Sequence, residues 1–352
     1  MTASIGRTAA VSDTGRKRRH NEDTYVLEPP IFAVVDGMGG ANAGEVASGL
    51  AAEALREGSP NGGEGERELV GLVQEANRRV YKRATEDSSA SGMGTTLTVA
   101  LVEEGRVLFG HVGDSRAYLI RDGELMQLTE DHSLVGELVR SGKLSPEAAE
   151  SHPQRSVITR ALGTDPNVDV DTFAQETRSG DIFVLCSDGL YSMVANPKIL
   201  ELVERNRGDL NAAAKALIAA ANRAGGDDNI TVVAFEIAAP GDETVRLPSV
   251  PEPEAAEPEP EPEEEDTLTE ADEVPAVTTM VIKPEDVARL AAQQQAPAPP
   301  AAAEPVEEPA PEPAVAPRAE PEPEPSHRLR AVVIAVLIAA IVAAIVIYLV
   351  SR

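Results

Sequence analysis

Three short acidic motifs in residues 1–240 carry the side chains best suited to chemistry. They are Val34–Gly40 (VVDGMGG), Cys186–Gly189 (CSDG) and Asp227–Thr231 (DDNIT). Each contains an aspartate, Asp36, Asp188 or Asp228, at the edge of an apolar run typical of a β-strand. Carboxylates at the ends of neighbouring strands can converge, and all-oxygen ligand sets suit Mg²⁺ or Mn²⁺. Water held between two such ions is a strong nucleophile near neutral pH, so the motifs predict a metal-dependent hydrolase.

Four further motifs complete a pattern through the same region. They are Gly15-x-x-Arg18-x-x-Asn21-Glu22-Asp23, Gly92-Met93-Gly94-Thr95-Thr96, Val112-Gly113-Asp114-Ser115-Arg116 and Thr129-x-Asp131-His132-Ser133. In this order and spacing the motifs resemble the metal-dependent serine/threonine protein phosphatases of type 2C, in their bacterial form. The resemblance covers roughly residues 5–238. A single short motif is weak, whereas seven in the same order are specific.

Strands joined mostly by tight turns, with a few helices in between, indicate an α+β fold. Strands are predicted at Thr96–Val102, Arg106–Phe109, Ala117–Ile120 and Ile182–Cys186. Helices are predicted at Val46–Arg56, Leu69–Arg83 and Leu210–Ala224, with a further helix start at Ser145–Glu147. The family resemblance implies more: an α-β-β-α sandwich of two antiparallel sheets, with helix pairs outside and the metals at one end.

Asp36 is predicted to be a bridging metal ligand, because the glycines after it allow a sharp turn that would let the Gly37 carbonyl face an ion. Read alone, Asp-Gly is more often a plain strand-to-turn sequence. Asp188 and Asp228 are predicted to complete the site. Asp188 follows an apolar strand that looks buried, where an unpaired carboxylate would be costly and a metal would remove that cost. Asp227 is the alternative to Asp228, and the family pattern of aspartate, asparagine and strand selects Asp228.

Two further acidic positions are assigned through the resemblance. Glu22 and Asp23 match a pair that acts near the metals, often through bound water, although a solvated pair at a strand start is the alternative. Asp114 matches the position of a third, weaker metal shared with Asp188. Alternatively, Asp114 caps a turn or pairs with Arg116.

Arg18 is predicted to bind the phosphate, because a planar guanidinium suits bidentate phosphate binding. The spacing to Asn-Glu-Asp selects Arg18 among its basic neighbours. Those neighbours, Arg16, Lys17 and Arg19, are predicted to form a basic entrance that attracts phosphopeptides. A simple solvated basic run is the alternative.

One position departs from the family pattern. Animal relatives carry a histidine after the Asp-Gly, able to protonate the leaving group, and here that residue is Met38. Many bacterial relatives also lack the histidine, so activity is not excluded. The general acid is therefore not assigned. Water on a metal and His132 are the two candidates, although the resemblance gives Asp131-His132 a structural role.

The resemblance also implies a mobile flap over Leu134–Leu162, near the mouth of the active site. Flaps of this kind help to select substrates. Ser141-Gly142 and Gly163 are the candidate hinges.

Net charge, cysteine content and the N-terminal sequence exclude several other classes of function. The formal net charge is −28, of which about −19 lies in residues 241–327 and about −12 in residues 1–240. An acidic domain argues against non-specific nucleic-acid binding. The single cysteine, Cys186, excludes an intrachain disulfide and is predicted to be buried. Met1–Arg19 is polar and basic, which predicts no signal peptide.

Three regions are predicted: a catalytic domain at 1–240, a disordered acidic linker rich in Pro, Glu and Ala at 241–327, and a membrane anchor at 328–352. Ala331–Val350 is twenty residues without a charge, the length of a transmembrane helix. Arg328 and Arg330 precede it, and the positive-inside tendency places this side in the cytoplasm. We therefore expect a single-pass protein of the cell membrane with a cytoplasmic catalytic domain.

Two islands interrupt the low-complexity linker, at Glu243–Leu247 and Thr278–Ile282. In each, a threonine stands three residues before an aliphatic residue. Phosphorylated threonine in this context resembles the ligands of forkhead-associated domains. Residues Ile282–Leu290 could also form a brief helix that binds a partner.

Together the motifs predict a membrane-tethered protein phosphatase with two or three Mn²⁺ or Mg²⁺ ions. The expected mechanism is in-line attack of a metal-bridging hydroxide on phosphoserine or phosphothreonine, with Arg18 and the cations stabilising charge on the phosphoryl oxygens. Expected partners are phosphoproteins, above all membrane-associated serine/threonine kinases and their targets. Two rival hypotheses are an inactive fold that binds phosphoproteins as a scaffold, and a sensor in which the linker and membrane span matter most.

Overall fold

The structure, a computed structural model, describes residues 4–39, 43–58, 65–150, 152–238 and 280–281. Its strands are β1 Ser4–Asp13, β2 Asp23–Glu28, β3 Ile31–Met38, β4 Gly94–Thr95, β5 Leu97–Glu103, β6 Arg106–Val112, β7 Arg116–Arg121, β8 Glu124–Gln127, β9 Val157–Ile158, β10 Asp171–Glu176, β11 Ile182–Cys186, β12 Ile230–Ala238 and β13 Met280–Val281. Its helices are α1 Ala43–Glu57, α2 Gly65–Glu86, α3 Leu134–Arg140, α4 Pro146–Glu150, α5 Asp188–Tyr191, α6 Asn196–Arg205 and α7 Leu210–Ala224, with a 3₁₀ turn at Ser88–Ala90.

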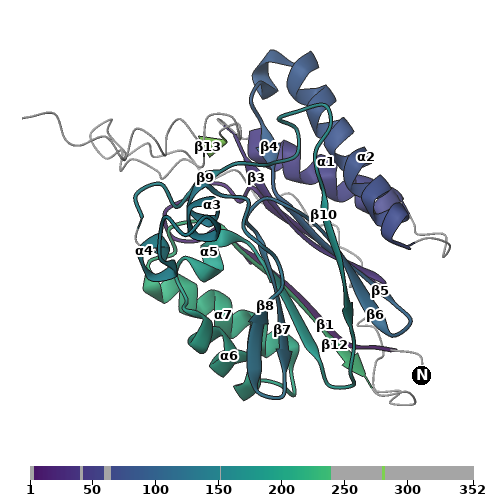
Figure 1. The fold of residues 1–352 in the computed structure, drawn as a ribbon, viewed down its shortest axis with the longest axis vertical. Helices are drawn as coiled ribbons and strands as arrows, with labels where there is room; N and C mark the ends of the chain where they lie inside the picture. Colours follow the sequence, from purple (N-terminus) through teal and green to yellow (C-terminus); the bar gives the residue numbers. More distant parts are fainter. Residues whose placement is uncertain (1–3, 40–42, 59–64, 151, 239–279, 282–352) are drawn as a thin grey trace, which may run out of the picture. The chain divides into compact units, whose positions relative to one another are not determined.

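Two antiparallel sheets form the centre of the fold (Figure 1). One has the strand order β1-β12-β11-β7-β8, and the other has the order β10-β6-β5-β3-β2, with β4 paired to the end of β3. The helix pair α1 and α2 covers the second sheet, whereas α7 packs on β1 and β12 of the first, beside α6. The prediction of an α+β sandwich with helices outside two antiparallel sheets is therefore confirmed.

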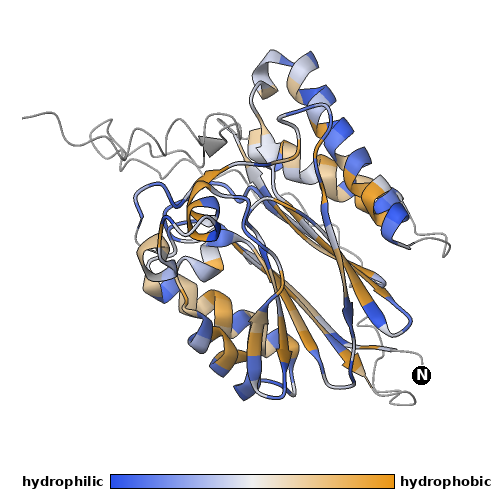
Figure 2. Ribbon diagram, viewed as in Figure 1, coloured by the Kyte–Doolittle hydropathy of each residue, from blue (hydrophilic) through white to orange (hydrophobic). Residues whose placement is uncertain are grey.

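Aromatic rings fill the space between the sheets. All five phenylalanines of the chain meet there, with Phe32 stacked on Phe235 at 4.2 Å between ring centroids and Phe235 on Phe183 at 5.1 Å. Figure 2 shows the strands as largely apolar and the outward faces of the helices as polar. Stacked rings with this burial contribute more than their area alone. The core thus fixes the two sheets against each other and sets the positions of the strand ends.

The helices begin and end where their capping residues place them. Asp209 accepts a hydrogen bond from the Ala212 amide at 3.0 Å, and α7 ends before Gly225. The predicted bounds of this helix and of strand β11 match the structure. Cys186 lies fully buried at the end of β11, as expected, and burial raises the pKa of its thiol to about 12.

The segment predicted to be a flap is partly regular. Ser133 caps α3 through a hydrogen bond from the Gly136 amide at 3.1 Å, and α4 begins after Ser145. The segment returns through β9, whose Ile158 is bridged to Ser133. On its other side, β9 pairs in parallel with β13, a piece of the predicted linker, with Met280 opposite Val157 and Val281 opposite Ile158.

Among the described helices, none is long and apolar enough to cross a membrane. The predicted span Ala331–Val350 lies outside the described residues, as does the predicted linker except for Met280–Val281. The helix suggested for Ile282–Leu290 and the first threonine island also lie outside them.

Candidate metal centre and active site

Six carboxylates gather where the ends of several strands meet. They come from the start of β2, the end of β3, the β6–β7 turn, the start of α5 and the residue pair before β12: Glu22, Asp23, Asp36, Asp114, Asp188 and Asp228. Asp23 and Asp114 are buried, whereas the other four keep part of their surface in solvent. Asp23 lies directly across from Asp36 in the β2–β3 ladder. The carboxylates of the sequence motifs therefore lie close enough to repel one another.

Crowding makes this cluster electrostatically unfavourable. Burial raises the pKa of Asp36 and of Asp188 well above the ordinary value, and repulsion among the cluster carboxylates raises both further. Burial raises the pKa of Asp23 to about 6 and that of Asp114 to about 7, with added repulsion from Asp228 and Asp131 respectively. Burial raises the pKa of Glu22 and Asp228 in the same direction.

Asp36 is held by the backbone around it. Its carbonyl accepts hydrogen bonds from the Thr95 hydroxyl at 2.7 Å and from the Thr96 amide at 2.9 Å. The next residue, Gly37, donates its amide to the Glu22 carbonyl at 3.1 Å. A Cβ on Gly37 would lie 2.1 Å from the Gly44 carbonyl oxygen, so only glycine fits where β2, β3 and α1 meet. The Asp-Gly sequence is therefore required by close backbone approach here.

The Glu22 side chain, just before β2, contacts the first turn of α1. The Gly44 amide, in the first turn of this helix, donates a hydrogen bond to the Glu22 carboxylate and lowers its pKa against the larger effect of burial. A Cβ on Gly44 would lie 2.7 Å from this carboxylate. The helix start and the acidic pair are thus locked together, which fixes where the Glu22 oxygens point.

Asp23 is tied to the opposite sheet. Its Oδ2 accepts a hydrogen bond from the Ser187 hydroxyl at 2.7 Å, and the Ser187 Oγ in turn accepts the Thr231 amide at 2.9 Å. Its Oδ1 is buried and has no hydrogen-bond partner among the described residues. A serine at this position was not singled out in the sequence, because only its proximity to Asp23 in space gives it this role.

Asp188 opens the short helix α5, and Asp114 lies beside the same helix. The Tyr191 hydroxyl donates to the Asp114 carbonyl at 3.1 Å and approaches its carboxylate Oδ2 at 3.3 Å. The alternative pairing of Asp114 with Arg116 is wrong, because Arg116 binds Asp131 at 2.6 Å and stacks on the Tyr191 ring at 3.6 Å from its centroid. The charge of Arg116 still lowers the pKa of Asp114, but burial and repulsion from Asp131 outweigh this effect.

Asp228 and Arg18 form an ion pair. Arg18 Nη2 lies 2.7 Å from Asp228 Oδ2, and both side chains are about one quarter exposed at 22% and 26%. Burial opposes the charge of Arg18, but Asp228, Asp188 and Glu22 together raise its pKa. Asp227 instead pairs with Lys17 at 2.8 Å, which favours Asp228 as the residue facing the cluster.

The loop that carries Arg18 is held by Asn229. Its side-chain amide donates to the carbonyls of Thr14 and His20 at 2.9 Å each, and its Oδ1 accepts the Glu22 amide at 2.8 Å. The asparagine of the Asp-Asn motif was recognised in the sequence only as part of a pattern. The structure shows that it joins the arginine loop to the end of the first sheet.

His132 does not reach toward the cluster with a free nitrogen. Its Nδ1 accepts the Gly113 amide at 3.0 Å, which leaves Nε2 to donate to Asp171 Oδ2 at 3.1 Å. Burial lowers its pKa, so the neutral form is favoured. The geometry matches the structural role implied by the family pattern, since His132 holds the turn that presents Asp114.

Met38 has a packing role at the position where animal relatives carry histidine. It is 7% exposed and packs with Ile158 and Ala161 of the flap. The base of the flap is anchored beside it, because Leu162 and Thr95 exchange backbone hydrogen bonds at 2.8 and 3.1 Å. Met38 therefore joins the end of β3 to the returning arm of the flap.

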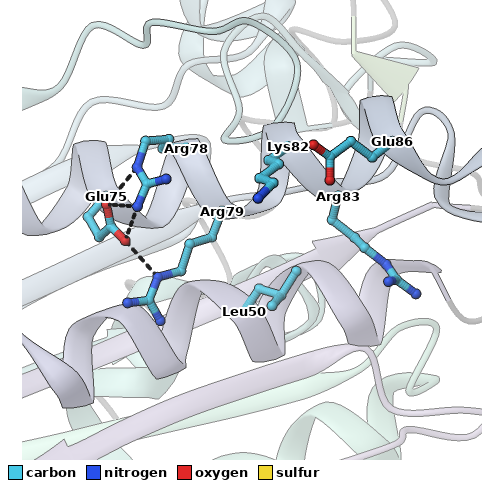
Figure 3. Close-up of a pocket in the computed structure, with 7 residues that line it drawn as sticks. All are labelled: Leu50, Glu75, Arg78, Arg79, Lys82, Arg83 and Glu86. Atoms are coloured by element: carbon cyan, nitrogen blue, oxygen red, sulfur yellow. Dashed lines mark hydrogen bonds and ion pairs between the residues drawn. The ribbon is translucent and has the colours of Figure 1, made fainter.

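A pocket of about 380 Å³ lies elsewhere, between α1 and α2. Figure 3 shows its lining residues, in which Arg78 and Arg79 turn to Glu75. Arg79 also pairs with Glu57 at 2.6 Å, and Arg83 pairs with Asp87 at 2.9 Å. These cations are neutralised on the helix surface, so the pocket is no competitor to the carboxylate cluster as the reactive site.

The cluster fits divalent cations by its chemistry. The donors are all oxygens, their ionised forms repel one another, and Asp23 offers a buried oxygen without a partner. In the described part of the chain, no three such side chains are close enough to form a complete ligand group. Which of them bind each ion therefore stays a prediction.

A two-sheet sandwich with this acidic end and an adjoining arginine defines a metal-dependent phosphoester hydrolase. Comparison with known proteins makes the class specific: the sequence profile described as protein phosphatase 2C matches residues 18–223. The chain belongs to this family and is a serine/threonine protein phosphatase.

Two named relatives illustrate the similarity. The serine/threonine phosphatase stp of Listeria innocua is 41% identical over 236 residues, covering 64% of this chain and 93% of that protein. The serine/threonine protein phosphatase PstP of Mycobacterium tuberculosis is 42% identical over 233 residues, covering 66% of this chain and 45% of that protein.

Solved structures agree. The crystal structure of the Mycobacterium tuberculosis phosphatase PstP/Ppp has a TM-score of 0.64 and 41% identity, covering 67% of this chain and all of that one. The catalytic domain of a phosphatase named PstP, in complex with two manganese ions, has a TM-score of 0.62 and 38% identity over 67% of this chain and 99% of that chain. The expectation of a Mn²⁺- or Mg²⁺-dependent enzyme is confirmed at the level of the family.

Proposed function

We propose that Asp36, Asp188 and Asp228, with the Gly37 carbonyl, hold two Mn²⁺ or Mg²⁺ ions, and that Asp114 shares a third with Asp188. Glu22 and Asp23 act next to these ions, directly or through water. The gathering of six carboxylates at the strand ends carries this proposal, because a divalent cation relieves the mutual repulsion that raises the pKa of Asp36 and Asp188. When bound, such ions supply an activated water and stabilise charge on the phosphoryl group.

Arg18 is the residue proposed to bind the phosphoryl oxygens of the substrate. Its guanidinium lies beside Asp228 at the partly exposed face of the cluster, so it can exchange this ion pair for a phosphate. Water adds to phosphorus and the serine or threonine oxygen leaves as the alcohol, so no phosphoenzyme is formed. Asn229 keeps the arginine loop in place during this exchange.

The experiment follows phosphate release from a phosphothreonine peptide by the full chain, with Mn²⁺, with Mg²⁺ and with chelator. Wild type is expected to be active with either metal and inactive with chelator, and Asp188→Asn is expected to lose at least about 100-fold in kcat/KM, as for loss of an essential electrostatic group. Asp227→Asn is the control, because Asp227 pairs with Lys17, and it should retain most of the activity. Full activity in Asp188→Asn would remove this aspartate from the metal site.

For the cellular role, we propose that residues 328–352 anchor the enzyme in the cell membrane with the catalytic domain in the cytoplasm. The uncharged run of twenty residues and the preceding Arg328 and Arg330 support this arrangement. Phosphoproteins near the membrane, above all serine/threonine kinases and their targets, are the proposed substrates. Fractionation of cells should place the full chain with the membranes and a chain ending at residue 327 in the soluble fraction. The opposite distribution would exclude the anchor.

A further inference from the structure

The returning arm of the flap carries an edge that already holds an extended segment. Strand β9 is bridged to Ser133 on one side and pairs with β13 on the other, so Val281 lies opposite Ile158. Main-chain pairing of this kind is how a sheet edge binds an extended peptide. We propose that the outer edge of β9 is a docking edge for the main chain of phosphopeptide substrates, and that residues Met280–Val281 occupy it in cis as a competitor.

The position of β9 connects this edge to the active site. Ile158 is fully buried and packs on Met38, two residues after Asp36. The following residue, Thr159, donates its amide to the His132 carbonyl at 2.8 Å, and the His132 ring holds the turn before Asp114. A peptide lying along β9 is therefore attached to elements that carry two of the cluster carboxylates.

The segment on this edge is distinct within its acidic surroundings. Residues 274–282 contain no charge and include six β-branched residues, in a region whose net charge is about −19. Such a composition favours an extended conformation. Two threonines, Thr278 and Thr279, directly precede the paired residues in the sequence.

The segment Met280–Val281 pairs with β9 although the main sheets offer longer edges. In the sequence, 41 residues, 239–279, separate β12 from β13. Four other edges belong to the two main sheets, namely β1, β8, β2 and β10, and each is longer than β9. The segment nevertheless pairs with β9. Tethering of this length raises its effective concentration at the edge to about the millimolar range, so a two-residue ladder suffices for competition.

The test compares three full-length proteins. In Met280→Pro/Val281→Pro, proline removes both amides and prevents strand pairing. The matched control, Leu268→Pro/Thr269→Pro, places the same dipeptide elsewhere in the linker. The double variant at 280–281 is expected to lower KM for a phosphothreonine peptide by about 3–10-fold, since the tethered competitor is lost. KM for p-nitrophenyl phosphate should not change, because that ester has no main chain.

Hydrogen exchange gives the second readout. Amides in residues 155–160 are expected to exchange about 10-fold faster in Met280→Pro/Val281→Pro than in wild type or the control. A synthetic peptide of residues 272–286, added to that variant, should restore both the slow exchange and the higher peptide KM. Equal exchange in all three proteins would show that the edge is not occupied in solution. A parallel change in KM for peptide and small ester would show that the edge does not bind substrate main chain.

Discussion

Ser187 shows how a single hydroxyl supports the acidic cluster. It donates to Asp23 at 2.7 Å and accepts the Thr231 amide at 2.9 Å, so it links β2 to the end of the other sheet. Ser187→Ala would remove this hydrogen bond to Asp23 and deprive the Thr231 amide of its Ser187 acceptor. We expect a loss of about 1–3 kcal/mol in the free energy of unfolding, measured by urea titration. The exposed Ser192→Ala in the same region should change it by less than about 0.5 kcal/mol.

The buried carboxylates make stability depend on pH. The folded pKa of Asp114 is about 7, above its ordinary value of 3.8, so between these values the folded state binds more protons than the unfolded state. This contribution to stability is present at low pH and is lost as pH rises toward 7. In chelator, Tm of wild type should therefore fall more steeply between pH 5.5 and 7.5 than Tm of Asp114→Asn, which cannot titrate. Equal slopes would show that Asp114 titrates normally.

At the scale of the elements, one glycine determines whether β2, β3 and α1 can meet. Gly37→Ala would bring a Cβ to 2.1 Å from the Gly44 carbonyl oxygen and 2.5 Å from that of Glu22. Separation of these backbones should cost about 1–3 kcal/mol and abolish most of the activity, because Asp36 and Glu22 move apart. Gly49→Ala in α1 is the control, since nothing lies within 4 Å of its Cβ. It should raise stability by about 0.5–1 kcal/mol in thermal melts and leave kcat/KM unchanged.

The elements that the sequence revealed are those with a local pattern. Leu210–Ala224 has an N-cap, an apolar stripe and a terminal glycine, and its bounds match the structure. Strand β11 is a continuous apolar run and matches as well. By contrast, the predicted helix Leu69–Arg83 is a turn longer at its start in the structure, because charged residues there hide the period. The two-residue strands β4 and β9 have no recognisable sequence pattern. Each forms only because it pairs with a strand far away in the sequence, β4 with β3 and β9 with β13.

The residues of the site also fall into those that the sequence predicted and those that it did not. The aspartates stand out because each belongs to one of seven motifs in a specific order, and their convergence could be expected. The roles of Asn229, Ser187 and Tyr191 could not, since each acts on residues far away in the sequence. The pairing of Arg116 with Asp131 also depended on how the β7–β8 hairpin brings them together. Positioning contacts of this kind are a property of the fold.

At the scale of the whole molecule, a cation should stabilise the folded chain. If, as proposed, Mn²⁺ binds the assembled carboxylates of the native state and not an unfolded chain, stability rises by about 2.7 kcal/mol at 100 times the dissociation constant. For a domain of this size, that gain corresponds to a rise in Tm of about 5–10 °C on addition of Mn²⁺. Asp188→Asn should show a much smaller rise. An equal rise in both proteins would indicate Mn²⁺ binding outside the cluster.

The proposed anchor separates catalysis from access to substrate. The carboxylates and Arg18 all lie within residues 18–228, so removal of residues 328–352 should leave kcat/KM on a soluble phosphothreonine peptide unchanged. With both enzyme and peptide on one vesicle, confinement raises their effective concentration. On peptide attached to vesicles by a lipid, we therefore expect the full chain to be at least about 10-fold faster than the truncated chain. The ratio should collapse when the peptide is cleaved from its lipid. If the full chain is slower than the truncated chain on vesicle-attached peptide, the anchor restricts the enzyme and the sensor hypothesis gains support.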